Sequence, residues 1–267
     1  MRSPRGAASI LVGSYHIGIS FEQALPGLGP ALDVARVVVL EVDADPATLA
    51  DDPAFLALAL LPDGEDLRRI LPPELWPKLR ERFAGVDDDA LARLAPWVLA
   101  SMLMVSDATG GAVAPAGDAS DAEAPAMLDE EVRARATARA TPIRALETLA
   151  EQVDLLRSIP VASYVAYLRS ALLAAGDSRR ALGDTMDAYI RGDTVVLEER
   201  ARAELVPELH DAMVVDRNLA WLDRLVAELE PGGAFVVVGL LHVVGERGLL
   251  ALLGERGYEV ERLTSDE

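Results

Sequence analysis

The sequence predicts an α/β fold with a mainly parallel central sheet, flanked by helices and carrying a helical insertion or cap in the middle of the chain. Short apolar runs rich in Val and Ile recur near both ends, and stretches with helical periodicity separate them. Residues 37–40 are apolar without alternation, as expected of a parallel strand buried on both faces. Half of the 267 residues are apolar, enough to form a sizeable core.

The first half of the chain begins as strand, crossover and strand. Residues 9–12 form an apolar run that stops at Gly13, and residues 22–36 are partly helical before the strand at 37–40. Residues 45–105 are rich in Leu, and their helical period is interrupted by prolines, which predicts several short helices. Residues 107–125 are rich in Gly, Ala, Pro, Ser and Asp and predict a surface loop or an active-site lid. We expect one domain over 1–267, with the helical insertion at about 45–140.

The second half is predicted to be mostly helical, with strands near its start and end. A charged helix is expected at 128–140 and a short strand at 142–146. Pro231, Gly232 and Gly233 stop the last long helix ahead of a β-branched strand at 234–238. A helix at 245–256 and a final strand at 258–263 complete the expected fold. The other predicted helical stretches are 147–157, 163–175, 181–191, 194–210 and 211–230.

Composition excludes several classes of function. The net charge of −19 repels phosphate backbones and argues against a nucleic-acid partner. The chain has no Cys, so disulfides, thiolate metal sites and a Cys nucleophile are excluded. Residues 1–6 contain no apolar segment typical of a signal peptide, which predicts a cytoplasmic protein, or a periplasmic or secreted one if a leader has been removed. The longest apolar runs are too short to span a bilayer.

Two of the three His residues lie in the same local motif. His16 and His242 each end a Gly-x-x-His sequence, beginning at Gly13 and Gly239, and each motif follows a strand-like run. At average Gly usage this coincidence has a probability of about 1–2 %. Gly permits a sharp turn and close backbone approach at the end of a strand, so each His is expected just beyond it. His210 lacks the motif and is expected to be an ordinary side chain near a helix end.

Carboxylates follow two other predicted strands. Glu41 and Asp43 come after the strand at 37–40, and Glu147 ends the strand at 142–146. Ligands of open α/β sheets bind beyond the carboxyl ends of the strands, which lie about 4.8 Å apart. Two imidazoles and two carboxylates in one cleft would suit Zn, Mn, Fe or Co. Alternatively, Glu41 caps the next segment, Asp43 is a turn residue, and Glu147 is the acidic residue at the start of its helix.

A late helix carries a polar pair within an apolar stripe. Asn218 places an amide on the face formed by Val214, Trp221 and Leu225, and Arg217 is its neighbour. A buried polar pair requires hydrogen-bond partners. The pair is therefore either a structural pin between helix and sheet, or Arg217 holds a site carboxylate or a developing oxyanion.

Together these motifs resemble the TraB/PrgY/GumN family, which includes the Tiki metalloproteases and is related to erythromycin-esterase-like and ChaN-like proteins. Ser14 stands where the family has Thr, Asp216 where it has Glu, and Leu240-Leu241 where it has small residues. The resemblance implies a metal-dependent peptidase or a related hydrolase. The matching segments, in chain order, are residues 10–16, Glu41, residues 146–148, residues 216–218, residues 238–249 and residues 257–260, with further likeness at residues 94–97 and 191–193.

The motifs and the resemblance together predict a metal-dependent hydrolase that acts on peptide bonds, or on another amide or ester. His16, His242, Glu41 and Glu147 are the candidate ligands of a divalent transition metal (Mn, Co, Zn or Fe), and Glu41 or Glu147 is the candidate general base. Arg217 and Asn218 orient the site. The alternatives are a metal-independent esterase-like hydrolase with a His base, and a non-catalytic regulatory protein that binds a peptide or small ligand. The expected partners are a peptide or small-molecule substrate and possibly a second copy in a homodimer.

Overall fold

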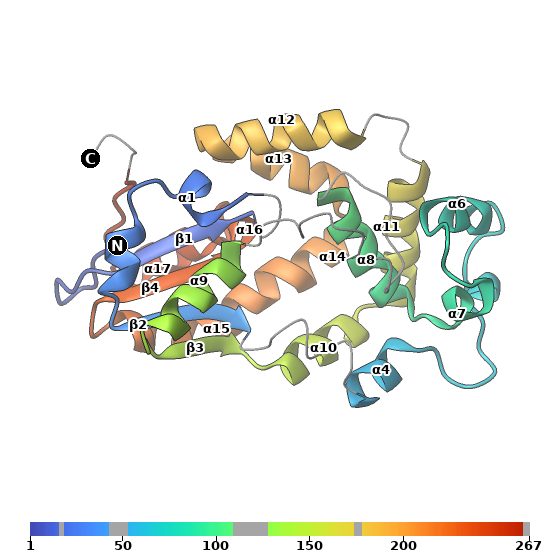
Figure 1. The fold of residues 1–267 in the computed structure, drawn as a ribbon, viewed down its shortest axis with the longest axis horizontal. Helices are drawn as coiled ribbons and strands as arrows, with labels where there is room; N and C mark the ends of the chain where they lie inside the picture. The colour runs from blue at the N-terminus through green and yellow to red at the C-terminus, as the bar shows by residue number, and fades with distance from the viewer. Residues whose placement is uncertain (16–18, 43–52, 109–127, 174–177, 264–267) are drawn as a thin grey trace.

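The computed structural model describes residues 1–15, 19–42, 53–108, 128–173 and 178–263. Within these ranges, four parallel strands form one sheet in the order β1-β4-β2-β3 (Figure 1). The α/β fold with a parallel sheet is therefore confirmed. The strands are β1 (Ile10–Ser14), β2 (Val37–Val42), β3 (Ile143–Glu147) and β4 (Ala234–Gly239).

The strand register brings the carboxyl ends of the strands to one edge. Ser14 pairs with Gly239, and Val42 pairs with Glu147, so the segment after each strand leaves the sheet at a similar level. β4 and β2 are the interior strands, and all six residues of β4 are buried. This arrangement is the one expected from the strand-end motifs.

Both faces of the sheet are covered, which explains why β2 and β4 are apolar without alternation. One face packs against α15 (Arg217–Leu229) and α17 (Leu249–Glu255), with Val39 and Val236 pointing into that layer. The other face packs against α1 (Phe21–Ala24), α2 (Gly29–Asp33) and α9 (Leu128–Ala138), with Val38 and Val237 in contact. Neighbouring residues of one strand thus belong to different cores.

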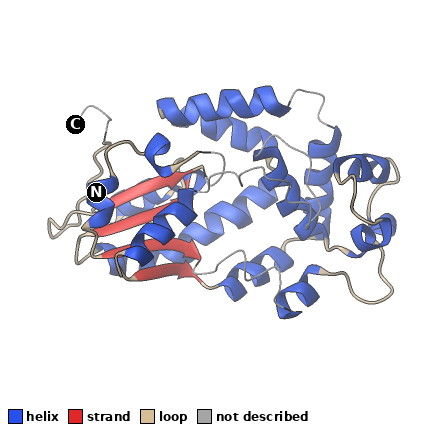
Figure 2. Ribbon diagram, in the orientation of Figure 1, coloured by secondary structure: helices blue, strands red, loops and turns tan. Residues whose placement is uncertain are grey.

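A helical part lies beyond the carboxyl edge of the sheet and has a core of its own (Figure 2). It draws on two stretches of the chain, before and after α9 and β3, whereas α9 itself, within the predicted insertion, covers the sheet. The first stretch contains α4 (Pro53–Ala59), α5 (Leu67–Ile70), α6 (Leu75–Arg82), α7 (Asp88–Arg93) and α8 (Pro96–Ala108). The second contains α10 (Leu149–Ser158), α11 (Val161–Leu173), α12 (Ser178–Arg191), α13 (Thr194–Glu204) and α14 (Pro207–His210).

Several predicted boundaries were wrong. Residues 258–263 form no strand: Glu259 makes a single antiparallel bridge with Arg2, and Leu263 is half exposed. The predicted helix at 194–210 breaks ahead of Pro207, because proline removes a helical N–H donor. The helix expected from Gly245 begins at Leu249, after a turn in which Gly245 has a φ of +88°.

Some predictions fall outside the described residues. These include His16, Asp43 and all of the loop predicted at 107–125 except its first two residues, which end α8. No helix in the described ranges is long and apolar enough to cross a membrane.

Candidate functional site

The centre of the candidate site is the guanidinium of Arg217, at the start of α15. Its Nη2 donates to Glu147 Oε1 at 2.6 Å and to Glu41 Oε2 at 2.7 Å, and its Nε donates to Glu147 Oε1 at 3.0 Å. Its Nη1 lies 3.2 Å from the Met213 carbonyl and 3.1 Å from His242 Nε2. One side chain thereby joins the ends of β2 and β3 to the segment after β4.

Glu147 is held on both of its oxygens. Oε1 accepts from Arg217, and Oε2 accepts from Trp221 Nε1 at 2.9 Å. The guanidinium carbon of Arg217 also lies 4.4 Å from the centre of the Trp221 ring, a cation–π distance. The Glu147 side chain is 7 % exposed. Its carboxylate is consequently fixed in place and shielded from water.

The charges of this cluster are strongly coupled. Burial alone lowers the pKa of Arg217, but the carboxylates of Glu41 and Glu147 outweigh burial, and the net shift of the pKa is upward. Arg217 therefore stays charged at all physiological pH values. The formal charges of these three side chains sum to −1, which favours a cation over an anion beside them.

Glu41 connects Arg217 to the second Gly-x-x-His motif. Its Oε2 accepts from Arg217, and its Oε1 accepts from the backbone N–H of Gly239 at 2.7 Å. The same Oε1 lies 3.7 Å from His242 Nε2. Gly239 is the residue ahead of the short helix α16 (Leu240–Val243), so this carboxylate sits where the helix dipole favours negative charge.

Arg217 and Asn218 together set the tautomer of His242. Arg217 can only donate, so the Nε2 of His242, 3.1 Å from Arg217 Nη1, accepts and carries no proton. Nδ1 is then the protonated nitrogen, and it donates to Asn218 Oδ1 at 2.8 Å. The Asn218 amide donates in turn to the carbonyls of His242 and Arg247, at 3.1 and 3.0 Å. This orientation presents a lone pair on Nε2 next to Glu41.

A π-helical turn precedes Arg217 and sets its direction. The segment η1 (Asp211–Asp216) connects α14 to α15 without a break. Leu209 and Val214 are both buried although they are five residues apart, a spacing that an α-helix does not keep on one face. The wider turn lets one continuous helix bury Leu209 in the core of the helical part and the polar pair Arg217 and Asn218 at the edge of the sheet.

Five of the predicted site residues meet at this edge: Glu41, Glu147, Arg217, Asn218 and His242. The Arg217 and Asn218 pair joins helix to sheet, and Arg217 binds the carboxylates of Glu41 and Glu147; that Arg217 also holds a developing oxyanion stays a prediction. Among the described residues, no three His, Asp or Glu side chains gather closely enough to hold a metal ion. His16, the other predicted imidazole ligand, is not in the described ranges.

The polar role of Trp221 was missed, because in sequence it reads as one more apolar residue of the stripe. A buried indole N–H usually requires a hydrogen-bond acceptor, and this general rule was the only signal in the sequence for such a contact. The backbone N–H of Gly239 was also missed as a donor to Glu41, and no pattern in the sequence marks it.

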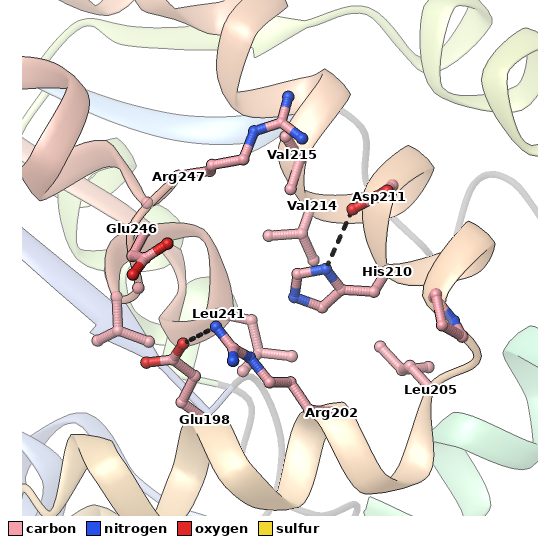
Figure 3. A pocket seen from close by; sticks show the side chains of 14 residues that line it. Glu198, Arg202, Leu205, His210, Asp211, Val214, Val215, Leu241, Glu246 and Arg247 are labelled. Carbon is pink, nitrogen blue, oxygen red and sulfur yellow. Dashed lines mark hydrogen bonds and ion pairs between the residues drawn. The ribbon is translucent and has the colours of Figure 1, made fainter.

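His210 lies apart from this cluster and lines a cavity of about 360 Å³ (Figure 3). The cavity is bounded by α13, α14, η1 and the segment 241–248. Two pairs of side chains face it: His210 Nδ1 is 3.8 Å from Asp211 Oδ1, and Arg202 forms an ion pair with Glu198, with Nη2 2.5 Å from Oε1 (Figure 3). Leu241 and Val244 line the cavity, whereas His242, which lies between them in the chain, does not.

Comparison with known proteins agrees with this arrangement of motifs. The TraB/PrgY/gumN family matches residues 2–262. The chain belongs to this family. Two relatives, both described as uncharacterized protein YbaP, come from Shigella flexneri and Escherichia coli strain K12. Each is 26 % identical to this chain. The alignment with the Shigella protein covers 94 % of this chain and 89 % of the relative. The alignment with the Escherichia protein covers 91 % of this chain and 86 % of the relative. No solved structure matches the chain.

Proposed function

We propose that this chain is a metal-dependent hydrolase that cleaves peptide bonds at the carboxyl edge of the sheet. The observation that carries the proposal is the orientation of His242. Asn218 holds its protonated Nδ1, and its Nε2 lone pair lies 3.7 Å from Glu41 Oε1. Imidazoles that bind metals in proteins are commonly held in this way through the nitrogen that does not face the metal.

The donor atoms fit a divalent transition metal. Two ligands that each bind one ion at about 2.1 Å in tetrahedral geometry are separated by roughly 3.4 Å, and His242 Nε2 and Glu41 Oε1 are 3.7 Å apart. His16 is the third ligand in the proposal, on the strength of its sequence motif. Glu147, an alternative ligand or base in the sequence, is assigned instead to anchoring Arg217, since it accepts three hydrogen bonds from the guanidinium and one from the Trp221 indole, whereas Glu41 accepts one from the guanidinium.

The remaining residues supply electrostatic support. A bound divalent metal would lower the pKa of a water molecule and polarise the scissile carbonyl. With Nε2 occupied as a ligand, the Nη1 group of Arg217 would be released from His242, while the two carboxylates keep the guanidinium in place. Nη1 can then donate to an oxyanion that develops on the substrate. Asn218 keeps the His242 ring in one orientation throughout.

The test combines metal analysis with matched His variants. The purified chain is titrated with Mn²⁺, Co²⁺ and Zn²⁺ by calorimetry, and cleavage of a peptide library is followed with and without a chelator. We expect binding of one ion, cleavage that the chelator abolishes, and loss of both in His242→Ala. His210→Ala is the control, because His210 lies in the separate cavity. The absence of metal binding together with chelator-resistant cleavage would overturn the proposal.

A metal-free hydrolase is the second candidate, and the contact between Arg217 and His242 favours it. A guanidinium 3.1 Å from Nε2 stands close to where a metal would approach, and the same lone pair can accept a proton from water. This candidate predicts full activity in the presence of a chelator and its loss in His242→Ala. Thermal stabilisation by a peptide without any product would instead indicate a binding protein.

A further inference from the structure

We propose that Tyr189 of α12 is a positioning residue for the first Gly-x-x-His motif. The inference rests on the proposed function and deepens it, because it assigns a helix of the helical part to the control of the site. No motif in the sequence singles out Tyr189. Its role emerges from contacts between segments that lie more than 170 residues apart, since its hydroxyl bond to Gly13 spans 176 positions.

The hydroxyl of Tyr189 bridges two backbone groups of the motif. It donates to the carbonyl of Gly13 at 2.9 Å, and it accepts from the backbone N–H of Tyr15. The rings of Tyr189 and Tyr15 are also in contact, with centroids 5.9 Å apart. One side chain thus holds the carbonyl at the first position and the amide at the third position of the motif, immediately before His16.

The position of β1 explains why such a bridge matters. β1 is an edge strand and pairs with β4 alone, and its last paired residue is Ser14. Beyond that point the ladder gives the chain no further support, and the Tyr15 amide takes its partner from another element instead. A hydroxyl that both donates and accepts satisfies two backbone groups at once.

The electrostatic surroundings keep this hydroxyl a donor. Burial, together with the charge of Asp129 at the start of α9, raises the pKa of Tyr189 to about 12, although the Tyr15 amide acts in the opposite direction. The phenol therefore stays protonated at neutral pH, and its bond to Gly13 persists.

The helix next to α12 approaches the second motif. α13 packs against α12, and a Cβ placed on Gly245 would lie 3.1 Å from Glu198 Oε1 of α13. The α12–α13 pair thus reaches the first motif through Tyr189 and, through Glu198, the turn at Gly245, three residues after His242.

The test is the variant Tyr189→Phe, which keeps the ring and removes both hydrogen bonds. The matched control is Tyr164→Phe: the Tyr164 hydroxyl donates to the Leu156 carbonyl at 2.6 Å within the helical part, away from the motifs. Mn²⁺ and Zn²⁺ affinities are measured by calorimetry, and amide hydrogen exchange is measured over residues 13–15. We expect Tyr189→Phe to weaken metal binding about 10- to 100-fold and to accelerate exchange there. Tyr164→Phe should change neither.

Each result bears on one of the two proposals. Unchanged exchange and unchanged metal affinity in Tyr189→Phe overturn the positioning role, as does an equal effect of both variants. Wild-type protein that binds no metal overturns the metal-dependent function, and the exchange of residues 13–15 then decides the positioning role by itself. A similar loss of global stability in the two variants, with metal affinity lost in Tyr189→Phe alone, supports positioning over a general structural effect.

Discussion

The two Gly-x-x-His motifs follow neighbouring strands, but the protein holds them in different ways. The second motif follows β4, an interior strand buried along its whole length, and His242 is fixed by Asn218 and packed 4.4 Å from the Trp221 ring. The first follows β1, an edge strand, and its turn is bridged by Tyr189 from the helical part.

The difference shows that the same sequence motif is held differently at the end of an interior strand and at the end of an edge strand. An interior strand end is surrounded by neighbours, so a single helix, α15, can supply a buried network that fixes the imidazole. An edge strand end has a neighbour on one side only and depends on an element from elsewhere in the chain. We therefore expect the second motif to be the rigid half of the site and the first to be the half that distant changes can adjust.

The largest effect is expected from removing the anchor of the second motif. Arg217→Met leaves the Glu147 carboxylate buried beside an apolar side chain, which should cost about 3–5 kcal/mol of unfolding free energy. Arg224→Met is the control, since Arg224 also lies in α15 and forms an ion pair with Glu151 of α10, but its side chain is half exposed. This variant should lose at most about 1 kcal/mol of unfolding free energy. Urea denaturation measures both. Equal losses would show that burial does not distinguish the two anchors.

A smaller effect is expected from removing the partner of His242. Asn218→Leu takes away the acceptor for Nδ1 and the donor to two carbonyls, at a cost of about 2–3 kcal/mol. Without an acceptor for Nδ1, the ring should turn away from Arg217 in part of the molecules and populate both tautomers, which ¹⁵N chemical shifts of the imidazole report. Asn218→Asp keeps the acceptor and should keep the Nδ1-protonated form. A single unchanged tautomer in Asn218→Leu would show that Arg217 alone orients the ring.

The contact between the two motifs can be tested at Gly13. A Cβ at this position would lie 2.6 Å from Leu240 Cδ1 and 3.1 Å from its Cα, so Gly13→Ala should destabilise the fold by about 1–3 kcal/mol. Gly183→Ala is the control, because nothing lies within 4 Å of a Cβ there, in α12. It should stabilise the protein by about 0.5–1 kcal/mol. Thermal unfolding of both variants measures the contrast, and a neutral Gly13→Ala would mean that the motifs do not pack tightly.

The smallest effect is expected at the exposed ion pair between Glu151, just after β3, and Arg224 of α15. Hydrogen bonds from Arg224 and then from the Thr148 backbone lower the pKa of Glu151 to about 2, from an ordinary 4.5. The depressed pKa means that this stabilisation is complete above pH 4.5 and is lost as the pH falls towards 2. Glu151→Gln should therefore be less stable than wild type by under about 1 kcal/mol at neutral pH. The difference should vanish near pH 2, and a constant difference across that range would contradict the assignment.

Much of the site could be predicted because it depends on local periodicity and strand ends. The unbroken apolar runs identified β2 and β4, and parallel strands place their carboxyl ends at one edge, so Glu41, Glu147 and His242 were expected together. Helical spacing placed Asn218 on the apolar face of α15. The strand expected at 258–263 was wrong, because its apolar residues find no strand to pair with beyond one bridge to Arg2.

Other features depend on neighbours that the local pattern does not contain. The indole of Trp221 binds Glu147 from 74 positions away, and the π-helical turn of η1 extends a helix whose sequence reads as continuous. Tyr189 meets Gly13 only because the helical part folds back over the edge of the sheet. Such contacts depend on how layers pack, and side-chain periodicity carries no information about that.

The sequence by itself determined the fold class and the strand-end positions of the motifs, since these follow from the local spacing of apolar and Gly residues, and the order of its motifs resembles that of the family. Only the tertiary structure decided that Arg217 ties two carboxylates to His242, that the His242 ring carries its proton on Nδ1, and that Tyr189 bridges the first motif. The physical reason is that hydrogen bonds between buried side chains are set by distance and direction in space, and residues far apart in the chain acquire these only on folding.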